Sequence, residues 1–169
     1  MNSPTPRPAV RILTTGGTFD KVHDWRTERL EFAGEGVSEV PVVLAHGRCE
    51  WPFIEHVCQL DSLDMTDADR AAIAERCEAA PEDCLVVTHG TSTIAETARF
   101  LDARSVPKTI VLTGAMRPHS LYVSDAAFNL GGALVAAQAL GRGVWAVMNG
   151  RVFAADEVVK NVELGRFDA

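Results

Sequence analysis

The sequence predicts an α/β protein of three layers (α/β/α), in which helices cover both faces of a mainly parallel sheet. Short apolar runs alternate with longer amphipathic stretches, as in chains built from βα units. Gly- and Thr-rich turns follow three of the apolar runs, where such units need tight connections. With 169 residues, 47% of them hydrophobic, the chain can bury one core. We therefore expect a single domain over residues 10–169, after a flexible, proline-containing leader over residues 1–9.

The first half of the chain is expected to contain strands and one helix. The predicted strands are Val10–Leu13, Val40–Ala45 and His56–Leu60. The charged, glycine-bearing stretch between Asp20 and Glu39 is typical of a surface loop or lid. Thr66 and Asp69 form a capping-box pattern, which predicts a helix that continues to about Ala79.

The second half repeats the alternation of strand and helix. The predicted elements are a strand at Cys84–Thr88, a helix at about Ile94–Leu101, a strand at Thr109–Leu112, a helix within Ser124–Leu140 and a strand at Val144–Met148. Gly131 and Gly132 are expected to let the last helix approach the sheet closely. The tail carries Arg151–Phe153 and Lys160.

Composition excludes several classes of function. The formal charge of −7 argues against a protein that tracks nucleic-acid phosphates. The chain has neither the apolar segment of a secretory signal nor an apolar run that would cross a membrane. We therefore expect a cytoplasmic protein whose four cysteines are reduced. His46, Cys49, His56 and Cys58 superficially resemble metal ligands, but no tight loop orients them, so we expect free thiols and no metal.

The three Gly/Thr turns are the candidate site, because ligands bind at the carboxyl ends of parallel strands. The first turn, Thr14–Thr18, has neither the Walker A ending nor the spacing G-x-G-x-x-G, which disfavours nucleotide binding. It is either a simple tight turn or a place where backbone approaches a ligand. The second turn, His89–Thr93, lies at a predicted helix start. Its hydroxyls either cap the helix or, with the helix dipole, hold a carboxylate or an oxyanion.

Two further observations concern nucleophilic chemistry. Gly90-x-Ser92 begins like the nucleophile elbow of serine hydrolases, but Ile94 stands where that turn needs a second glycine. A threonine hydroxyl needs a base. Lys160 can serve if burial favours its neutral amine, although most lysines are solvated.

Taken together, the ordered motifs resemble the bacterial-type L-asparaginase/glutaminase family. The segments that carry the resemblance are Thr15–Thr18, Thr88–Thr93, Gly114–Pro118, Ser124–Leu130 and Asp61–Met65. The resemblance extends from about Leu13 to Lys160. It implies the fold of the N-terminal domain of L-asparaginases, and it places the chain in a short, single-domain branch.

The resemblance also implies an activity and a set of residue roles. The activity is hydrolysis of the side-chain amide of L-asparagine to L-aspartate and ammonia through a threonine acyl-enzyme, an amidohydrolase reaction of the EC 3.5.1 type. The implied catalytic residues are Thr18, Thr91 and Lys160, and which threonine attacks first stays open. The implied substrate-binding residues are Gly17, Ser62, Thr91, Ser92 and Ala115. The resemblance implies no cofactor, and it implies a homodimer or homotetramer whose neighbouring subunits complete or stabilise the sites.

Four departures from the family pattern bear on this expectation. Ser92 stands where the family usually has an aspartate for the substrate's α-ammonium group, and Leu63 stands where longer members often have glutamine. The loop near the first threonine lacks the usual tyrosine, and the only tyrosine is Tyr122. His23 lies in that loop and is either a proton relay or a solvated histidine. The 169 residues contain no counterpart of the second domain of longer members, which fits either a short-chain form or part of a longer chain.

These departures leave two alternatives to an asparaginase. The chain could be a binding or regulatory protein on the same scaffold that has lost turnover. It could instead be an amidase whose substrate lacks an α-ammonium group, because serine at position 92 keeps a hydrogen bond but loses the charge.

Overall fold

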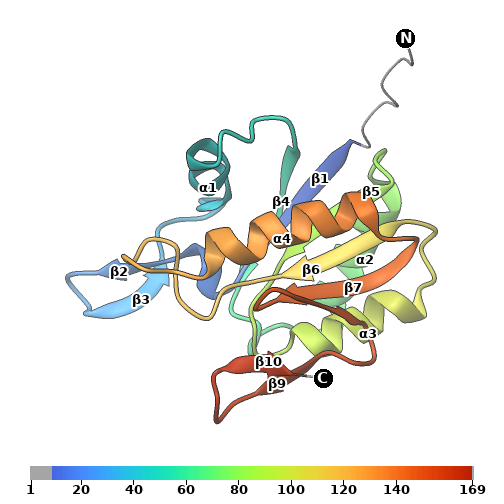
Figure 1. Cartoon of the computed structure of the whole chain (residues 1–169). Coiled ribbons are helices and arrows are strands. Elements are labelled where there is room, and N and C mark those ends of the chain that lie inside the picture. Colours follow the sequence, from blue (N-terminus) through green and yellow to red (C-terminus); the bar gives the residue numbers. More distant parts are fainter. Residues whose placement is uncertain (1–8, 169) are drawn as a thin grey trace.

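A six-stranded sheet forms the centre of the molecule in the computed structural model, which describes residues 9–168 (Figure 1). The strand order is β4-β1-β5-β6-β7-β8. The strands are β1 (Val10–Gly16), β4 (Phe53–Leu60), β5 (Cys84–Thr88), β6 (Thr109–Thr113), β7 (Gly143–Met148) and β8 (Arg151–Ala154). All neighbours pair in parallel except β7 and β8, which pair antiparallel. The mainly parallel sheet is therefore confirmed, whereas the predicted leader lies almost wholly outside the described residues.

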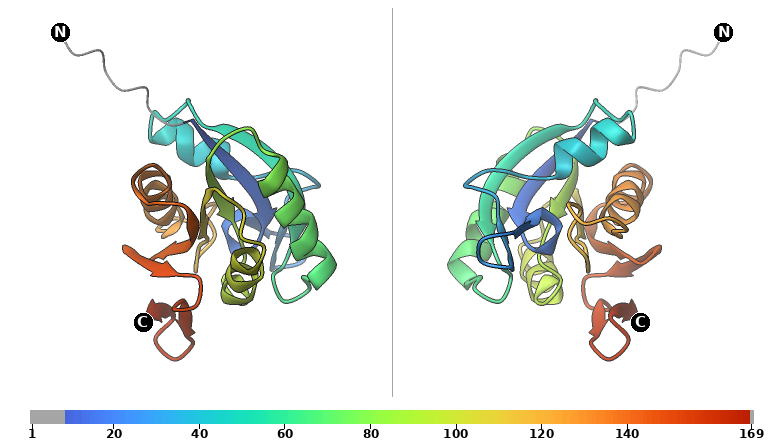
Figure 2. Two further views of the ribbon diagram at one scale, coloured as in Figure 1. Left: turned by 90° about the vertical axis from the view of Figure 1, so that its right-hand side faces the viewer. Right: turned by 90° about the vertical axis from the view of Figure 1, so that its left-hand side faces the viewer.

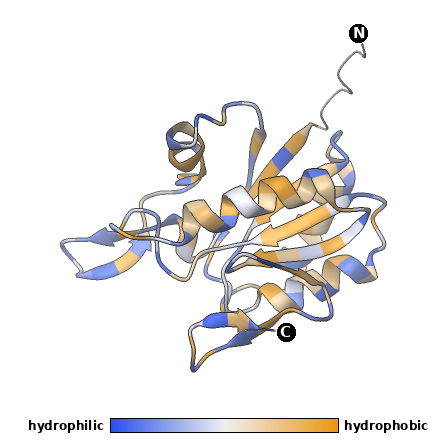
Figure 3. Cartoon of the chain, viewed as in Figure 1, coloured by the Kyte–Doolittle hydropathy of each residue, from blue (hydrophilic) through white to orange (hydrophobic). Residues whose placement is uncertain are grey.

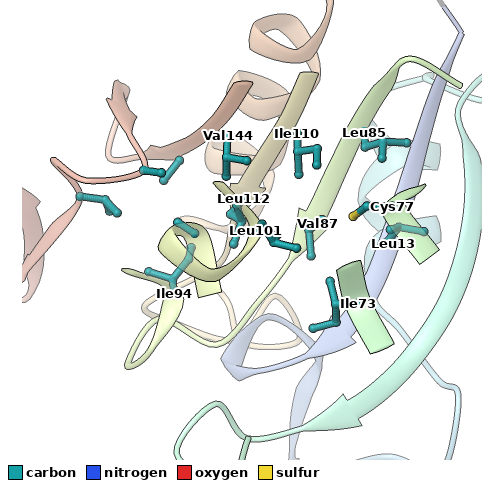
Figure 4. Close-up of a cluster of buried hydrophobic side chains, with 14 of the residues drawn as sticks. Leu13, Ile73, Cys77, Leu85, Val87, Ile94, Leu101, Ile110, Leu112 and Val144 are labelled. Atoms are coloured by element: carbon teal, nitrogen blue, oxygen red, sulfur yellow. The ribbon is translucent and has the colours of Figure 1, made fainter. Parts of the chain in front are cut away.

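Helices cover both faces of this sheet. They are α1 (Val40–His46), α2 (Asp67–Ala79), α3 (Ile94–Ala103) and α4 (Ala126–Ala139). Helices α2 and α3 lie on one side and α4 on the other (Figure 2). Because side chains alternate along a strand, Leu85 and Val87 join the core beneath α2 and α3, whereas Val86 joins the core beneath α1 and α4. Figure 4 shows the first of these clusters, where side chains of the strands meet Ile73 and Leu101 of the helices.

Local sequence signals account for the helices that were predicted. Helix α2 begins after Thr66, whose hydroxyl accepts from the Asp69 backbone N–H while the Asp69 carboxylate accepts from the Thr66 N–H, which completes the capping box. Helix α4 contains no charged residue and is apolar around most of its circumference (Figure 3). A Cβ on Gly132 would lie 3.1 Å from the Val147 side chain, so glycine here allows the predicted close packing against the sheet. A Cβ on Gly131 would meet nothing within 4 Å, so the prediction holds for only one of the pair.

The prediction of a strand at Val40–Ala45 is wrong, because this segment forms helix α1. Pro41 occupies its first turn, where a helix tolerates proline. Val40, Val43 and Leu44 are buried, and this spacing of three and four residues is helical. The run of β-branched residues concealed that spacing.

The expectation of a surface loop between Asp20 and Glu39 is also partly wrong. A 3-10 turn at Thr18–Asp20 leads into an antiparallel hairpin of β2 (Lys21–Asp24) and β3 (Arg29–Phe32). The hairpin projects from the sheet at the left of Figure 1.

A second hairpin, of β9 (Val159–Asn161) and β10 (Arg166–Asp168), also lies outside the main sheet. The sequence did not indicate it or strand β8. Within residues 9–168, the structure contains no helix that has both the length and the apolar character of a membrane span.

Candidate active site

The three Gly/Thr turns lie side by side at the carboxyl edge of the sheet. They follow β1, β5 and β6, which are adjacent strands. Thr14 pairs with Thr88, and Thr88 pairs with Thr113, so the three strands end at one level. The Thr15 hydroxyl donates to the Thr88 carbonyl at 2.7 Å and joins the first two strand ends. This side chain is therefore structural.

Backbone packs directly against backbone where the first turn meets the second. Gly17 has a φ of +75°, which favours glycine, and a Cβ there would lie 2.5 Å from the Gly90 Cα. A Cβ on Gly90 would in turn lie 2.5 Å from the Ser62 Oγ. Glycine at both positions therefore brings Thr18, Ser62 and Thr91 to one region through their immediate neighbours.

The third turn packs against the same second turn. A Cβ on Gly114 would lie 2.4 Å from the His89 carbonyl oxygen and 3.3 Å from Cγ2 of Thr91. The following Ala115 is fully buried. The Asp125 carboxylate accepts hydrogen bonds from the backbone N–H groups of Met116 and Arg117, which fixes the turn that carries Ala115.

The principal side-chain contact of the site joins Thr91 and Lys160. The Lys160 Nζ donates to the Thr91 Oγ1 at 2.9 Å, although 69 residues separate the two along the chain. Thr91 is only 5% exposed. Burial lowers the pKa of the Lys160 amine, while the carboxylate of Asp61 partly opposes that effect. The pair therefore has the parts of a hydroxyl and its base.

The second hairpin positions this lysine. Phe167 lies opposite Lys160 in the β9–β10 register and is 1% exposed. Val158, just before β9, is also fully buried. These two apolar side chains belong to the core cluster and so fix the hairpin that carries Lys160.

An open cavity of about 390 Å³ lies beside the pair. Thr91, Ser92 and Lys160 line it together with Glu96 and Arg99 of α3. The Ser92 side chain is exposed. The structure thus brings Thr91, Ser92 and Lys160 together at this cavity, whereas Thr18 and Ser62 are not among the residues that line it.

Ser62 is 2% exposed, and its Oγ has no hydrogen-bond partner among the described residues. The hydroxyl is therefore uncommitted but shielded by the Gly90 turn. Leu63, the next residue, is 73% exposed. His23 lies on β2 opposite Leu30 with its side chain exposed, and within residues 9–168 no hydrogen bond joins it to Thr91 or Lys160.

A buried hydrogen-bond chain supports the second turn from below. The His89 Nδ1 lies 2.8 Å from the Gly90 carbonyl, so it carries the proton and donates. The other ring nitrogen accepts from the Thr97 hydroxyl at 2.9 Å, and the Arg70 Nε donates to that hydroxyl. Burial lowers the pKa of His89 to about 4, so the ring is neutral and this direction of donation is fixed.

Sequence reasoning missed an ion pair at the margin of the site. The Lys21 Nζ lies 2.5 Å from the Asp61 carboxylate, which joins the first hairpin to the turn that carries Ser62. No periodic signal links positions 40 residues apart, so the sequence could not show it. Within the described residues 9–168, no group of three or more His, Cys, Asp or Glu side chains could hold a metal ion.

Comparison with known proteins identifies the family of the chain. The family described as "Asparaginase, N-terminal" matches residues 9–169. The chain belongs to this asparaginase family. It is 34% identical to L-asparaginase 2 of Escherichia coli (strain K12) and 33% identical to the probable periplasmic L-asparaginase of Haemophilus influenzae, with 90% of the chain and 46% of each relative covered.

Solved structures give the same family. The crystal structure of L-asparaginase I from Vibrio cholerae matches with a TM-score of 0.81 and 27% identity over 96% of this chain and 51% of that one. The fold is thus that of the N-terminal domain of asparaginases, as the resemblance implied. The chain spans about half the length of the relatives it matches. The expected cytoplasmic location stays a prediction.

Proposed function

We propose that this protein hydrolyses the side-chain amide of L-asparagine to L-aspartate and ammonia through a threonine acyl-enzyme. The observation that carries the proposal is the Lys160 amine 2.9 Å from the Thr91 hydroxyl, partly withdrawn from solvent beside an open cavity. Membership of the asparaginase family supports the reaction class. The relatives named as L-asparaginases support L-asparagine as the substrate.

The proposed reaction proceeds in two displacements. A threonine Oγ attacks the side-chain carbonyl carbon of the substrate, and its proton passes to the neutral amine of Lys160. The carbon–nitrogen bond breaks, the proton is delivered to the leaving nitrogen, and ammonia departs. Water then attacks the ester, and the threonine oxygen recovers a proton as aspartate leaves.

Two threonines are available for this chemistry. Thr91 contacts the base directly, whereas Thr18 lies on the adjacent turn, next to the Gly17–Gly90 contact. We assign Thr91 and Lys160 to proton transfer and retain both threonines as candidate nucleophiles. Mass spectrometry of acid-quenched enzyme will locate the acyl group on the peptide that contains Thr18 or on the one that contains Thr91.

The substrate is held, in this proposal, by groups at the three turns. Gly17 and the Ala115 backbone contact the side-chain amide, and Ser62 receives the α-carboxylate. The start of α3, with Thr91 and Ser92, contributes the positive end of the helix dipole, which favours an anionic group. His23 is proposed as a proton relay that reaches the site from the first hairpin.

Ser92 favours a second candidate substrate. Its neutral, exposed side chain lines the cavity, so no carboxylate is present at this position to bind an α-ammonium group. Serine in place of the family's aspartate would weaken the binding of an amide that lacks this group less than that of L-asparagine, because charge-assisted hydrogen bonds are about twice as strong as neutral ones. The same feature motivates the reading of a binding protein without turnover.

Ammonia release from L-asparagine, L-glutamine and unsubstituted amides separates these possibilities. We expect release from L-asparagine, and a higher kcat/KM for Ser92→Asp. Activity on simple amides alone would favour the second substrate class. Binding of aspartate without turnover in either form would favour the non-catalytic reading.

Three variants test the assigned residues. We expect Thr18→Ala, Thr91→Ala and Lys160→Met each to reduce hydrolysis by at least about 100-fold, as direct catalytic groups do. Lys108→Met and Thr109→Val are matched controls, because both residues lie at the amino end of β6, at the opposite edge of the sheet. Near-normal rates in all three site variants would refute the assignment.

We further propose that the protein assembles as a homodimer or homotetramer. The cavity is open, and α4 presents the apolar side chains of Phe128 and Val135, each 66% exposed, on its outer side. Exposed apolar surface of this kind favours association. Light scattering coupled to size-exclusion chromatography gives the mass, and a monomer at micromolar concentration that retains full activity would contradict this proposal.

A further inference from the structure

The Lys21–Asp61 ion pair lies between the first hairpin and the active-site lysine. Lys21 is the first residue of β2, and its Nζ contacts Asp61 at 2.5 Å. Both side chains are largely withdrawn from solvent, with 19% and 32% of their surface exposed. The Ser120 hydroxyl donates to the Lys21 carbonyl at 2.8 Å, so the strand that carries the lysine is also joined to the segment that follows the third turn.

Asp61 also lies near Lys160, because the neighbouring Ser62 packs against Gly90, and Gly90 precedes Thr91, whose hydroxyl Lys160 contacts at 2.9 Å. The hydrogen bond from Lys21 is the main reason that the pKa of Asp61 is lowered, and the charge of Lys160 acts in the same direction. The effect is reciprocal, because the Asp61 carboxylate raises the pKa of Lys160 against the lowering caused by burial. One carboxylate thus faces two amines.

The other charged side chains near Lys160 have a weaker electrostatic effect on its amine. Glu96 and Arg99 line the same cavity from α3, but they carry opposite signs and both are exposed, so water and salt screen them. On β10, Arg166 and Asp168 form a pair with each other at 3.0 Å. Glu163, in the turn between β9 and β10, is exposed. Asp61 is partly buried, and its carboxylate, although paired with Lys21, is the charge that raises the pKa of Lys160.

We propose that Asp61 is a positioning residue that divides its negative charge between Lys21 and Lys160, and thereby sets how readily Lys160 gives up its proton. Lys21 withdraws part of that charge from Lys160 while the first hairpin is seated against the site. The ion pair therefore links the position of the hairpin to the protonation of the base. This inference deepens the proposed function and rests on it for the role of Lys160 as a base.

The two partners of the pair predict opposite results when each is removed. Asp61→Asn takes away the charge that favours the ammonium form and leaves the Lys21 ammonium unneutralised, so the pKa of Lys160 falls. Its amide oxygen can still accept the Leu63 N–H bond that the carboxylate now accepts at 3.1 Å. Lys21→Met releases the whole carboxylate charge toward Lys160, so the pKa of Lys160 rises.

NMR measures the pKa of Lys160 without any need for catalysis. The chain contains three lysines, Lys21, Lys108 and Lys160, so protein labelled with 13C-lysine gives three Cε signals to follow through a pH titration. Lys160→Met assigns the signal of interest. Lys108 is the internal reference, because its Nζ donates to the carbonyls of Cys77, Glu78 and Ala80 at the end of α2, away from the site.

We expect the titration midpoint of Lys160 to move by roughly half a pH unit or more, downward in Asp61→Asn and upward in Lys21→Met, with Lys108 unchanged. The double variant is expected between the two. A pair that merely braces the structure would affect both single variants in the same sense. Shifts of the same sign, or no shift in either variant, would overturn the inference.

Activity provides the second measurement. If Lys160 is the base, the acidic limb of kcat/KM moves with the NMR midpoint in each variant. Opposite NMR shifts without hydrolysis of any amide would support the proposed role of Asp61 and refute the proposed function. Hydrolysis whose pH profile is the same in wild type and both variants would sink the inference and leave the function standing.

Discussion

Replacement of Ser62 by alanine should make the protein more stable and the site weaker. The Ser62 Oγ is buried and unpartnered, so folding removes its bonds to water without replacing them. Such a group costs about 1–3 kcal/mol, and alanine avoids this cost while losing only one oxygen. We therefore expect Ser62→Ala to raise the free energy of unfolding by about 1 kcal/mol, and Tm by about 2–4 °C for a domain of this size.

Affinity should change in the opposite direction. If Ser62 receives the α-carboxylate of the substrate, the variant loses one hydrogen bond to a charged group, worth about 1.5–3 kcal/mol, so its Kd for L-aspartate rises at least about tenfold. Urea unfolding gives the first quantity, and isothermal titration calorimetry gives the second.

Ser120→Ala is the matched control, because the Ser120 hydroxyl is exposed and donates to the Lys21 carbonyl. It should lose up to about 1 kcal/mol of stability, the usual net value of a hydrogen bond. A loss of stability in Ser62→Ala would show that its hydroxyl has a partner, such as a buried water. An unchanged affinity for aspartate would remove Ser62 from the binding site.

Four further variants test the reasoning. Gly17→Ala should lower the free energy of unfolding by at least about 2 kcal/mol and remove most activity, because its Cβ would lie 2.5 Å from Gly90 and its φ is +75°. Gly131→Ala, whose Cβ would meet nothing within 4 Å, should raise the free energy of unfolding by about 0.5–1 kcal/mol. Urea unfolding compares the two variants. Lys108→Met should lose about 2 kcal/mol in the same assay, since three carbonyls at the end of α2 lose their donor, while its kcat/KM stays near normal. Burial raises the pKa of Asp20 to about 6, so the folded state resists its ionisation and the stability from this group is present below about pH 4 and lost as pH rises through 6. The free energy of unfolding of Asp20→Asn should therefore rise relative to that of wild type by up to about 3 kcal/mol between pH 4 and 7. A difference between the two proteins that does not change with pH would contradict a raised pKa of Asp20.

The sequence predicted those elements whose local signals agree with their tertiary surroundings. The capping box at Thr66 and the apolar run of Cys84–Thr88 each specify one structure, and both are confirmed. Val40–His46 was misread because β-branched residues favour a strand, while the helical burial of Val40, Val43 and Leu44 decided the outcome. The hairpins were missed because their strands are only three or four residues long and carry little hydrophobic pattern.

The same distinction separates the site residues that local sequence signals indicated from those that they did not. Motifs at strand ends indicated Thr91 and Ser92, because the edge of a parallel sheet is a local consequence of the βα pattern. The contact of Lys160 with Thr91 was expected only from resemblance, since no spacing rule relates a tail residue to a turn 69 residues earlier. The Lys21–Asp61 pair had neither a motif nor a resemblance to indicate it.

The contact of Gly17 with Gly90 restricts how relatives of this chain can diverge. Peptide atoms form the wall between the first two turns, and no side chain there can be trimmed to enlarge the space or extended to narrow it. We therefore expect relatives to differ at exposed side chains such as Leu63 and Ser92, whose replacement leaves this contact intact. The contact between the two turns is fixed by main chain, whereas the exposed side chains around it are free to change.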